Sequence, residues 1–141
     1  MRLRTALIMS LLISSPTVFA DSNAVTAYKG AKDSVVMLLA LDSSGEGISI
    51  GTGFYVGDGS TVVTNFHVIQ GASSIRLKNS SGIVSDISTV VAFDQLHDLA
   101  ILKAVASGQP LSLKADEPQI GEEVYAIGNP KGLESTLSEG I

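Results

Sequence analysis

The sequence predicts an all-β protein, a small antiparallel barrel or sandwich that begins with one short helix. Six short runs rich in apolar and β-branched residues, each bounded by turn-forming residues, support this prediction. Fourteen glycines and an aromatic content of only 5% also favour many turns and short strands over a helical bundle. Of the 141 residues, 45% are hydrophobic and 16% are charged, which argues against a disordered chain.

The first twenty residues have the layout of a secretory signal peptide. Arg2 and Arg4 precede an apolar run over residues 6–13, and Pro16 then interrupts that run. A transmembrane anchor is the alternative, but the run is much shorter than the ~20 residues that cross a bilayer. We therefore predict cleavage after Ala20, export to the periplasm or the medium, and no membrane span afterwards.

The elements that follow are predicted from hydrophobic periodicity and turn residues. Residues 23–32 have a helical spacing of apolar side chains, and Ser22 or Asn23 would cap this helix. Six strands are expected next, because apolar runs alternate there with clusters of Gly, Asp, Asn and Ser. Their ranges are 35–41, 48–56, 61–64, 73–78, 83–93 and 99–104. The fifth is either one long strand or a bent one.

The pattern changes at residue 105. Residues 105–120 contain one glycine and two prolines, which indicates a linker. Beyond it we expect a strand over 122–127, a turn over 128–132 and the start of another strand over 136–141.

Charge and cysteine content exclude several functions. The chain has nine Lys and Arg and fourteen Asp and Glu, a net charge of −5, which gives no support to nucleic-acid binding, because that function needs a basic surface. The absence of cysteine rules out disulfides, thiolate catalysis and Cys-ligated zinc or iron–sulfur sites.

Two residues at predicted strand ends have the chemistry of a proton-transfer pair. His67 follows the strand over 61–64, and histidine is the side chain best matched to proton transfer near neutral pH. Asp98 opens the strand over 99–104, and a carboxylate that orients a histidine fixes its tautomer and stabilises the imidazolium. Taken alone, each residue is more commonly structural.

The neighbouring His97 is expected to be exposed and non-catalytic. Strand alternation turns adjacent side chains in opposite directions, so His97 would point away from Asp98. His67, His97 and Asp98 lack the tight spacing of a metal site, so no metal is predicted.

One predicted strand contains two glycines, which are uncommon inside strands. Gly51 and Gly53 remove side chains where another group comes close, and a bulge or a bend of a barrel is the alternative explanation.

Four short segments occur in a characteristic order: Gly-Thr-Gly-Phe at 51–54, Val-Thr-Asn-Phe-His-Val at 63–68, Asp-Leu-Ala-Ile-Leu-Lys at 98–103, and Gly-Glu-Glu-Val-Tyr-Ala-Ile-Gly-Asn-Pro-Lys-Gly-Leu at 121–133. Together they resemble the trypsin-like serine peptidases, and in particular their HtrA/Deg branch, over residues 34–141. The resemblance implies two six-stranded antiparallel β-barrels with the active site between them. It implies His67 as the general base, Asp98 as its orienting carboxylate, a polypeptide substrate, and no cofactor or metal.

The same resemblance gives the domain organisation. Residues 1–20 are the signal peptide, 21–110 the N-terminal trypsin-like barrel, and 111–141 a linker with the incomplete start of a second barrel. In this family the nucleophile and the oxyanion hole come from a Gly-x-Ser-Gly-Gly segment, which these 141 residues do not contain. The sequence therefore predicts a fragment of an exported serine endopeptidase that has His and Asp but no nucleophile, and that is inactive and poorly soluble by itself. A non-catalytic exported barrel that binds a peptide or a protein partner is the alternative.

Overall fold

The structure, a computed structural model, describes residues 22–128 and 136–141. Within these ranges the elements are α1 (Asn23–Ala31), β1 (Val35–Leu41), β2 (Gly47–Val56), β3 (Thr61–Thr64), α2 (Phe66–Ile69), β4 (Ser74–Lys78), β5 (Val84–Asp94), β6 (Leu99–Ala104), β7 (Val124–Gly128) and β8 (Thr136–Gly140). The predicted signal peptide over 1–20 and most of the predicted turn over 128–132 lie outside the described residues.

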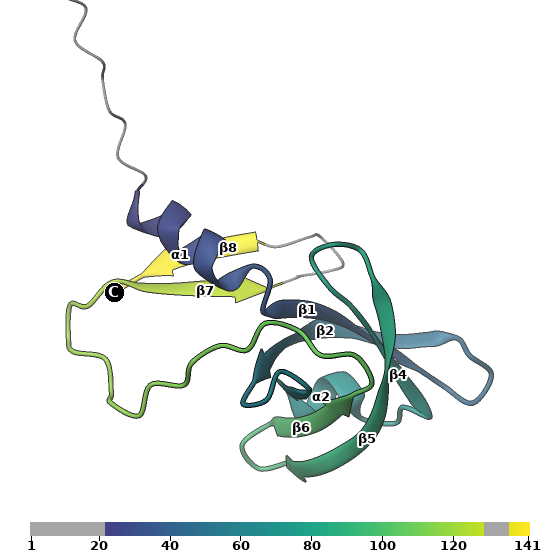
Figure 1. The fold of residues 1–141 in the computed structure, drawn as a ribbon. Coiled ribbons are helices and arrows are strands. Elements are labelled where there is room, and N and C mark those ends of the chain that lie inside the picture. The colour runs from purple at the N-terminus through teal and green to yellow at the C-terminus, as the bar shows by residue number, and fades with distance from the viewer. Residues whose placement is uncertain (1–21, 129–135) are drawn as a thin grey trace, which may run out of the picture.

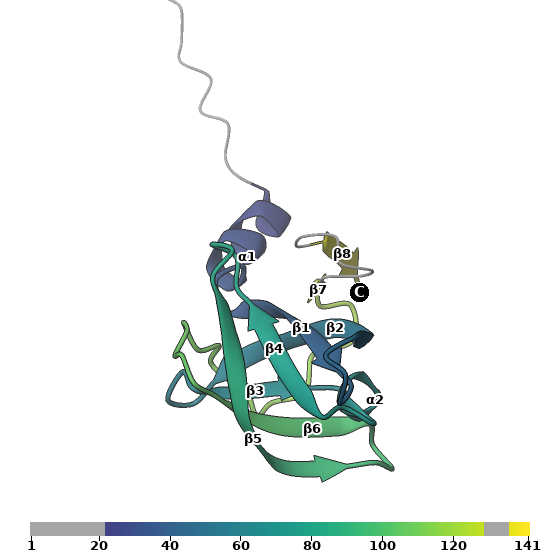
Figure 2. The ribbon, with the colours of Figure 1, turned by 90° about the vertical axis from the view of Figure 1, so that its right-hand side faces the viewer.

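Strands β1 to β6 close into one antiparallel barrel in the order β1-β2-β3-β6-β5-β4 (Figure 2). Most neighbours in this order are also neighbours in the chain. The exceptions are the β3–β6 and β1–β4 pairs, which join strands that are distant in sequence. A closed barrel leaves none of its strands with a free edge. The predicted all-β fold is confirmed, and of the two architectures considered the barrel is the one that forms.

The hydrophobic core fills the interior of this barrel. Side chains alternate along each strand, so β6 buries Ala100, Leu102 and Ala104 and turns the residues between them outward. The largest fully buried side chains are Tyr55, Leu38, Leu77, Leu102, Val36 and Val62. Burial of each such leucine stabilises the fold by roughly 1.5–3 kcal/mol.

Of the two forms that the sequence leaves open for this segment, β5 is the bent one. Its register against β6 shifts between Ile87 and Thr89 and again between Val90 and Ala92. Such irregularities increase the local twist of a strand and allow a small sheet to close on itself. The β5–β6 turn lies at the end of the barrel where β3 finishes, because Thr64 at the end of β3 pairs with Ala100 at the start of β6.

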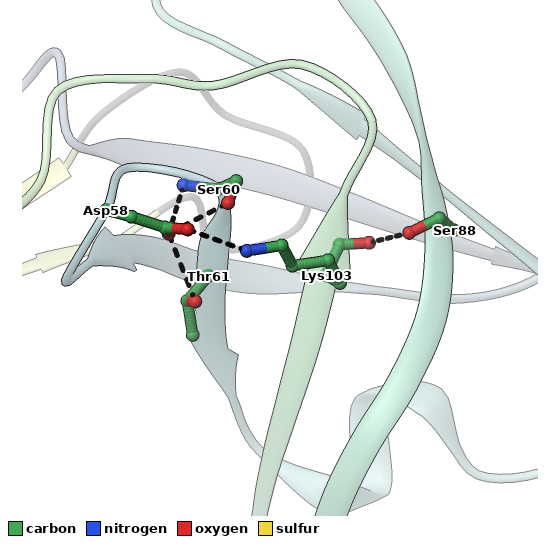
Figure 3. A network of polar contacts seen from close by, with 5 residues as sticks. All are labelled: Asp58, Ser60, Thr61, Ser88 and Lys103. Atoms are coloured by element: carbon green, nitrogen blue, oxygen red, sulfur yellow. Dashed lines mark hydrogen bonds and ion pairs between the residues drawn. The ribbon is translucent and has the colours of Figure 1, made fainter.

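A polar network fastens the β2–β3 turn to β6 (Figure 3). Lys103 Nζ donates to Asp58 Oδ2 at 2.7 Å, and Asp58 Oδ1 accepts the backbone N–H and the hydroxyl of Ser60 at 3.0 and 2.8 Å. Ser88 Oγ on β5 donates to the Lys103 carbonyl at 2.9 Å. The Lys103 ammonium and the Ser60 donors hold the pKa of the Asp58 carboxyl well below its ordinary value.

Helix α1 and the β7–β8 pair lie together outside the barrel (Figure 1). The helix is capped as predicted by Ser22, whose hydroxyl accepts the Val25 N–H at 3.3 Å. Asn23 Nδ2 donates to Glu123 Oε2 at 3.0 Å, which joins the helix to the segment before β7. None of the described helices is long and apolar enough to cross a membrane.

Strands β7 and β8 form a separate two-stranded antiparallel sheet. Residues 105–120, which connect it to the barrel, contain no helix or strand. Their contacts with the barrel include an isolated bridge between Leu111 and Val56 and backbone hydrogen bonds from Val105 and Gly108.

Candidate active site

His67 lies in α2, a one-turn helix that follows β3, rather than at the strand end that the sequence predicts. The preceding residues Thr64 and Asn65 continue the β pattern, and four helical residues are too few to show a period of 3.6. Val68 and Ile69 of this helix are buried in the core. The helix is therefore anchored to the barrel, while the His67 side chain stays 66% exposed.

Asp98 is the last residue of the turn between β5 and β6, directly before the strand that the sequence expects it to open. Its φ of 52° places it in the left-handed region, which no other described non-glycine residue adopts. Aspartate and asparagine enter this region more readily than other L-residues, but a conformational cost remains. The position of the Asp98 carboxylate is thus set by an unusual backbone.

The barrel brings His67 and Asp98 together because β3 pairs with β6, with Thr64 opposite Ala100. Asp98 Oδ2 lies 2.7 Å from His67 Nδ1, and Asp98 Oδ1 accepts the backbone N–H of His67 at 2.8 Å. These backbone and side-chain hydrogen bonds lower the pKa of the Asp98 carboxyl. An ionised carboxylate at Nδ1 favours the tautomer with its proton on Nδ1, which leaves Nε2 free to accept one.

His97 forms a second pair, with Asp94. The Nδ1–Oδ2 distance is again 2.7 Å, and Asp94 Oδ1 accepts the backbone N–H groups of Leu96 and His97 at 2.9 and 3.1 Å. His97 is 68% exposed, as predicted, although it lies in a turn and not in a strand, so strand alternation is not the reason. The His97 pair joins the end of β5 to the adjoining turn, three positions along the chain, whereas the His67 pair joins helix α2 to the β5–β6 turn, 31 positions apart.

The two glycines of β2 both lie where side chains approach the strand, as predicted. A Cβ on Gly51 would lie 2.7 Å from Val68 Cγ1, and a Cβ on Gly53 would lie 2.8 Å from Val62 Cγ1. The register of β2 against β1 is continuous at both positions, so a bulge is not the explanation. Gly51 therefore lets the helix that carries His67 pack directly on the barrel.

Two further contacts at α2 are not predicted by the sequence reasoning. Asn65 Nδ2 donates to the backbone carbonyl of Asp98 at 3.0 Å, and the Phe66 ring stacks on Phe93 of β5 with centroids 5.1 Å apart. The only feature of the sequence that could have drawn attention to Asn65 and Phe66 is their position directly before His67 in the segment over 63–68. Across the described residues, no cluster of three or more His, Cys, Asp or Glu side chains could hold a metal.

Comparisons with known proteins agree with this geometry. The family described as "Trypsin-like peptidase domain" matches residues 51–141. Protease Do-like 1, chloroplastic, from Arabidopsis thaliana is 40% identical over 96 residues, covering 64% of this chain and 21% of that protein. A probable periplasmic serine endoprotease DegP-like from Chlamydia trachomatis is 38% identical over 93 residues, covering 64% of this chain and 18% of that protein.

A solved structure shows the same fold. The serine endoprotease from Yersinia pestis superposes with a TM-score of 0.75 at 30% identity, over 87% of this chain and 45% of that chain. The chain spans less than a quarter of the length of the curated relatives named above. The family match covers well over half of the sequence and includes both His67 and Asp98. The chain therefore belongs to the trypsin-like serine peptidases, in their HtrA/Deg-like branch.

Proposed function

We propose that this chain supplies the general base and the orienting carboxylate of an exported serine endopeptidase. The observation that carries the proposal is the His67–Asp98 pair, in which one carboxylate oxygen meets the imidazole and the other accepts the backbone N–H of the same residue. In this role His67 Nε2 takes the proton of a serine hydroxyl as its oxygen attacks a peptide carbonyl. His67 then donates that proton to the leaving amine, while Asp98 stabilises the imidazolium.

The proposal places the serine and the oxyanion hole in a second barrel that continues after Ile141. Its support is that the chain covers 45% of the Yersinia pestis endoprotease, and that residues 1–141 contain no Gly-x-Ser-Gly-Gly segment. Residues 21–110 are then the N-terminal barrel, and 111–141 are the linker and the first strands of the second. Sequencing the gene past codon 141 tests this: a frame that continues into the serine segment supports it, and a stop codon there contradicts it.

The two histidines offer a matched test of the base. In the protein extended through the serine segment, His67→Ala should lower kcat/KM for a peptide substrate by about 10⁴-fold or more. His97→Ala removes an equally short His–Asp pair and should change kcat/KM by less than about twofold. Equal losses in the two variants would overturn the assignment.

A serine-directed fluorophosphonate should label the extended protein but not the 141-residue chain.

One relative favours a second candidate function. The anti-sigma-I factor RsgI9 of Acetivibrio thermocellus is 33% identical over 111 residues, covering 77% of this chain and 16% of that protein. Its name describes a regulatory factor rather than a peptidase. In this alternative the chain is a non-catalytic exported barrel that binds a peptide or a protein partner. Partner binding that survives His67→Ala, in an extended protein without hydrolytic activity, would support it.

Export is the remaining part of the proposal. It rests on the signal-like residues 1–20 and on relatives named as periplasmic from Chlamydia muridarum and Hahella chejuensis. Expression with the native N-terminus followed by N-terminal sequencing should give a mature chain that starts at Asp21. A chain that retains Met1 would contradict export by cleavage.

A further inference from the structure

We propose that Asn65 is a positioning residue for the His67–Asp98 pair and acts on it through the backbone of Asp98. The proposal rests on the function proposed above for this pair, but its geometry can be measured without catalysis.

The orientation of the Asp98 carboxylate depends on a backbone conformation that needs support. Asp98 has a φ of 52°, and the left-handed region costs an L-residue free energy relative to extended or helical backbone. The direction of the Cα–Cβ bond relative to the chain changes when φ changes. A relaxed Asp98 would therefore swing its carboxylate away from α2 and from both of its hydrogen bonds to His67.

Asn65 occupies the N-cap position of α2 but makes no capping hydrogen bond with its side chain. An N-cap asparagine ordinarily accepts the backbone N–H of the second or third helical residue. Here the second helical residue is His67, and its N–H is accepted by Asp98 Oδ1 at 2.8 Å. The Asp98 carboxylate thus caps α2 in place of the Asn65 side chain, although Asp98 lies 33 positions later in the chain.

The side-chain amide of Asn65 instead contacts the backbone of Asp98. Its Nδ2 donates to the Asp98 carbonyl at 3.0 Å. Asp98 therefore caps the helix that Asn65 begins, while Asn65 holds the carbonyl of the left-handed residue. If Asn65 turned back to cap α2, it would compete for the His67 N–H and release one of the two anchors of the carboxylate. An amide suits this position because it donates to a carbonyl and brings no second negative charge beside Asp98.

The test measures the imidazole of His67 by NMR in the full chain labelled with nitrogen-15. In the wild type the Nδ1–H should give a resolved resonance with slow exchange, because the proton lies between Nδ1 and Asp98 Oδ2. Asn65→Ala removes the donor, and the nearly isosteric Asn65→Asp replaces it with a charged acceptor. Both should abolish this resonance or speed its exchange with water by about fivefold or more, the factor expected for one net hydrogen bond.

Asn23→Ala provides a matched control. It also removes an amide that donates to an oxygen at 3.0 Å, that of Glu123, but this contact lies at α1. The control should leave the His67 resonance unchanged. An unchanged resonance in both Asn65 variants would overturn the proposal, as would an equal change in Asn23→Ala. Loss of the folded state in both Asn65 variants would also overturn it, because a positioning role alters the pair within a folded barrel.

A kinetic measurement separates this proposal from the function on which it rests. In the protein extended through the serine segment, the Asn65 variants should lower kcat, shift the pH profile of kcat and leave KM nearly unchanged, because substrate binding does not use this amide. If the wild type hydrolyses no peptide while the NMR differences are present, the proposed function fails and the positioning role stands. If the Asn65 variants keep the wild-type resonance and rate, the positioning role fails and the proposed function stands.

Discussion

At the scale of single residues, the position of His67 depends on a glycine sixteen residues earlier. A Cβ at Gly51 would meet the Val68 side chain, the residue after His67 in α2. Gly51→Ala should therefore push α2 away from β2, lower the free energy of unfolding by about 1–3 kcal/mol, and weaken the His67–Asp98 hydrogen bond. Denaturant unfolding and the His67 Nδ1–H resonance measure the two effects.

Gly53→Ala is the control for Gly51→Ala. Its added methyl group would meet Val62 and Leu38 inside the barrel, so it should cost similar stability while the His67 resonance stays as in the wild type. Val68→Ala should partly restore the resonance in the Gly51→Ala background, because it removes the methyl groups that collide. A normal His67 resonance in Gly51→Ala alone would show that α2 can shift without cost to the pair.

The sequence predicts His67 and Asp98 as a pair, and the structure brings the two side chains together, but the sequence gives no sign of the contact that Asn65 makes with Asp98. The two chemistries are visible in residue types, and the family resemblance orders them along the chain. The contact between Asn65 and Asp98 joins residues 33 positions apart and depends on a left-handed backbone. No local pattern in the sequence specifies that conformation, because an aspartate before a strand is ordinarily a turn residue.

At the scale of elements, the strands of the barrel were predictable because each is a short apolar or alternating run bounded by turn residues. Strands β3 and β6 have the predicted ends, and β1 matches the predicted run of seven apolar residues. Helix α2 was missed because buried Val68 and Ile69 extend the apolar pattern of β3 past its end. In this segment the packing of two side chains into the core decides the backbone, which the local sequence does not reveal.

The network between Asp58 and Lys103 gives a prediction at this scale. The pKa of Asp58 is lowered in the folded state, so its contribution to stability is present above the ordinary aspartate pKa of about 4 and is lost as the pH falls through the folded value. Asp58→Asn should thus lower the Tm at pH 7, and the difference from the wild type should shrink in strong acid. Added salt should also shrink it, because both side chains are largely exposed.

Asp42→Asn is the matched control for Asp58→Asn. Asp42 accepts hydrogen bonds from Ser44 and Glu46 in the β1–β2 turn, much as Asp58 accepts those of Ser60. An asparagine oxygen can keep these bonds, so the Tm of this variant should respond little to salt. A salt response of equal size in both variants would show that the ion pair between Lys103 and Asp58 contributes nothing to the Tm.

At the scale of the whole molecule, the barrel and the β7–β8 sheet should differ in local stability. A two-stranded sheet is marginal by itself, and Val124 of β7 remains 43% exposed. Amide hydrogen exchange at residues 124–128 and 136–140 should be at least about tenfold faster than at 35–41 and 99–104. Equal protection of both sets would show that the two parts unfold as one unit.

The predicted poor solubility also belongs to this scale and remains a prediction. Ile120, Leu113 and Ile141 are strongly exposed in the segments around this sheet. Exposed apolar side chains beside sheet edges favour association between chains. A sharp, concentration-independent melt of a monomer would contradict the prediction.

The strand order of the barrel also links its chemistry to its folding pathway. Strands β3 and β6 are neighbours in space but are separated in the chain by β4 and β5, so their pairing closes a long loop and carries its entropy cost. His67 and Asp98 meet only when that loop closes. A nascent or partly unfolded chain could form every hairpin of the barrel while His67 and Asp98 remain apart. The hydrogen bond between these two side chains is thus a built-in reporter of barrel closure, and its rate of appearance during refolding would time that step.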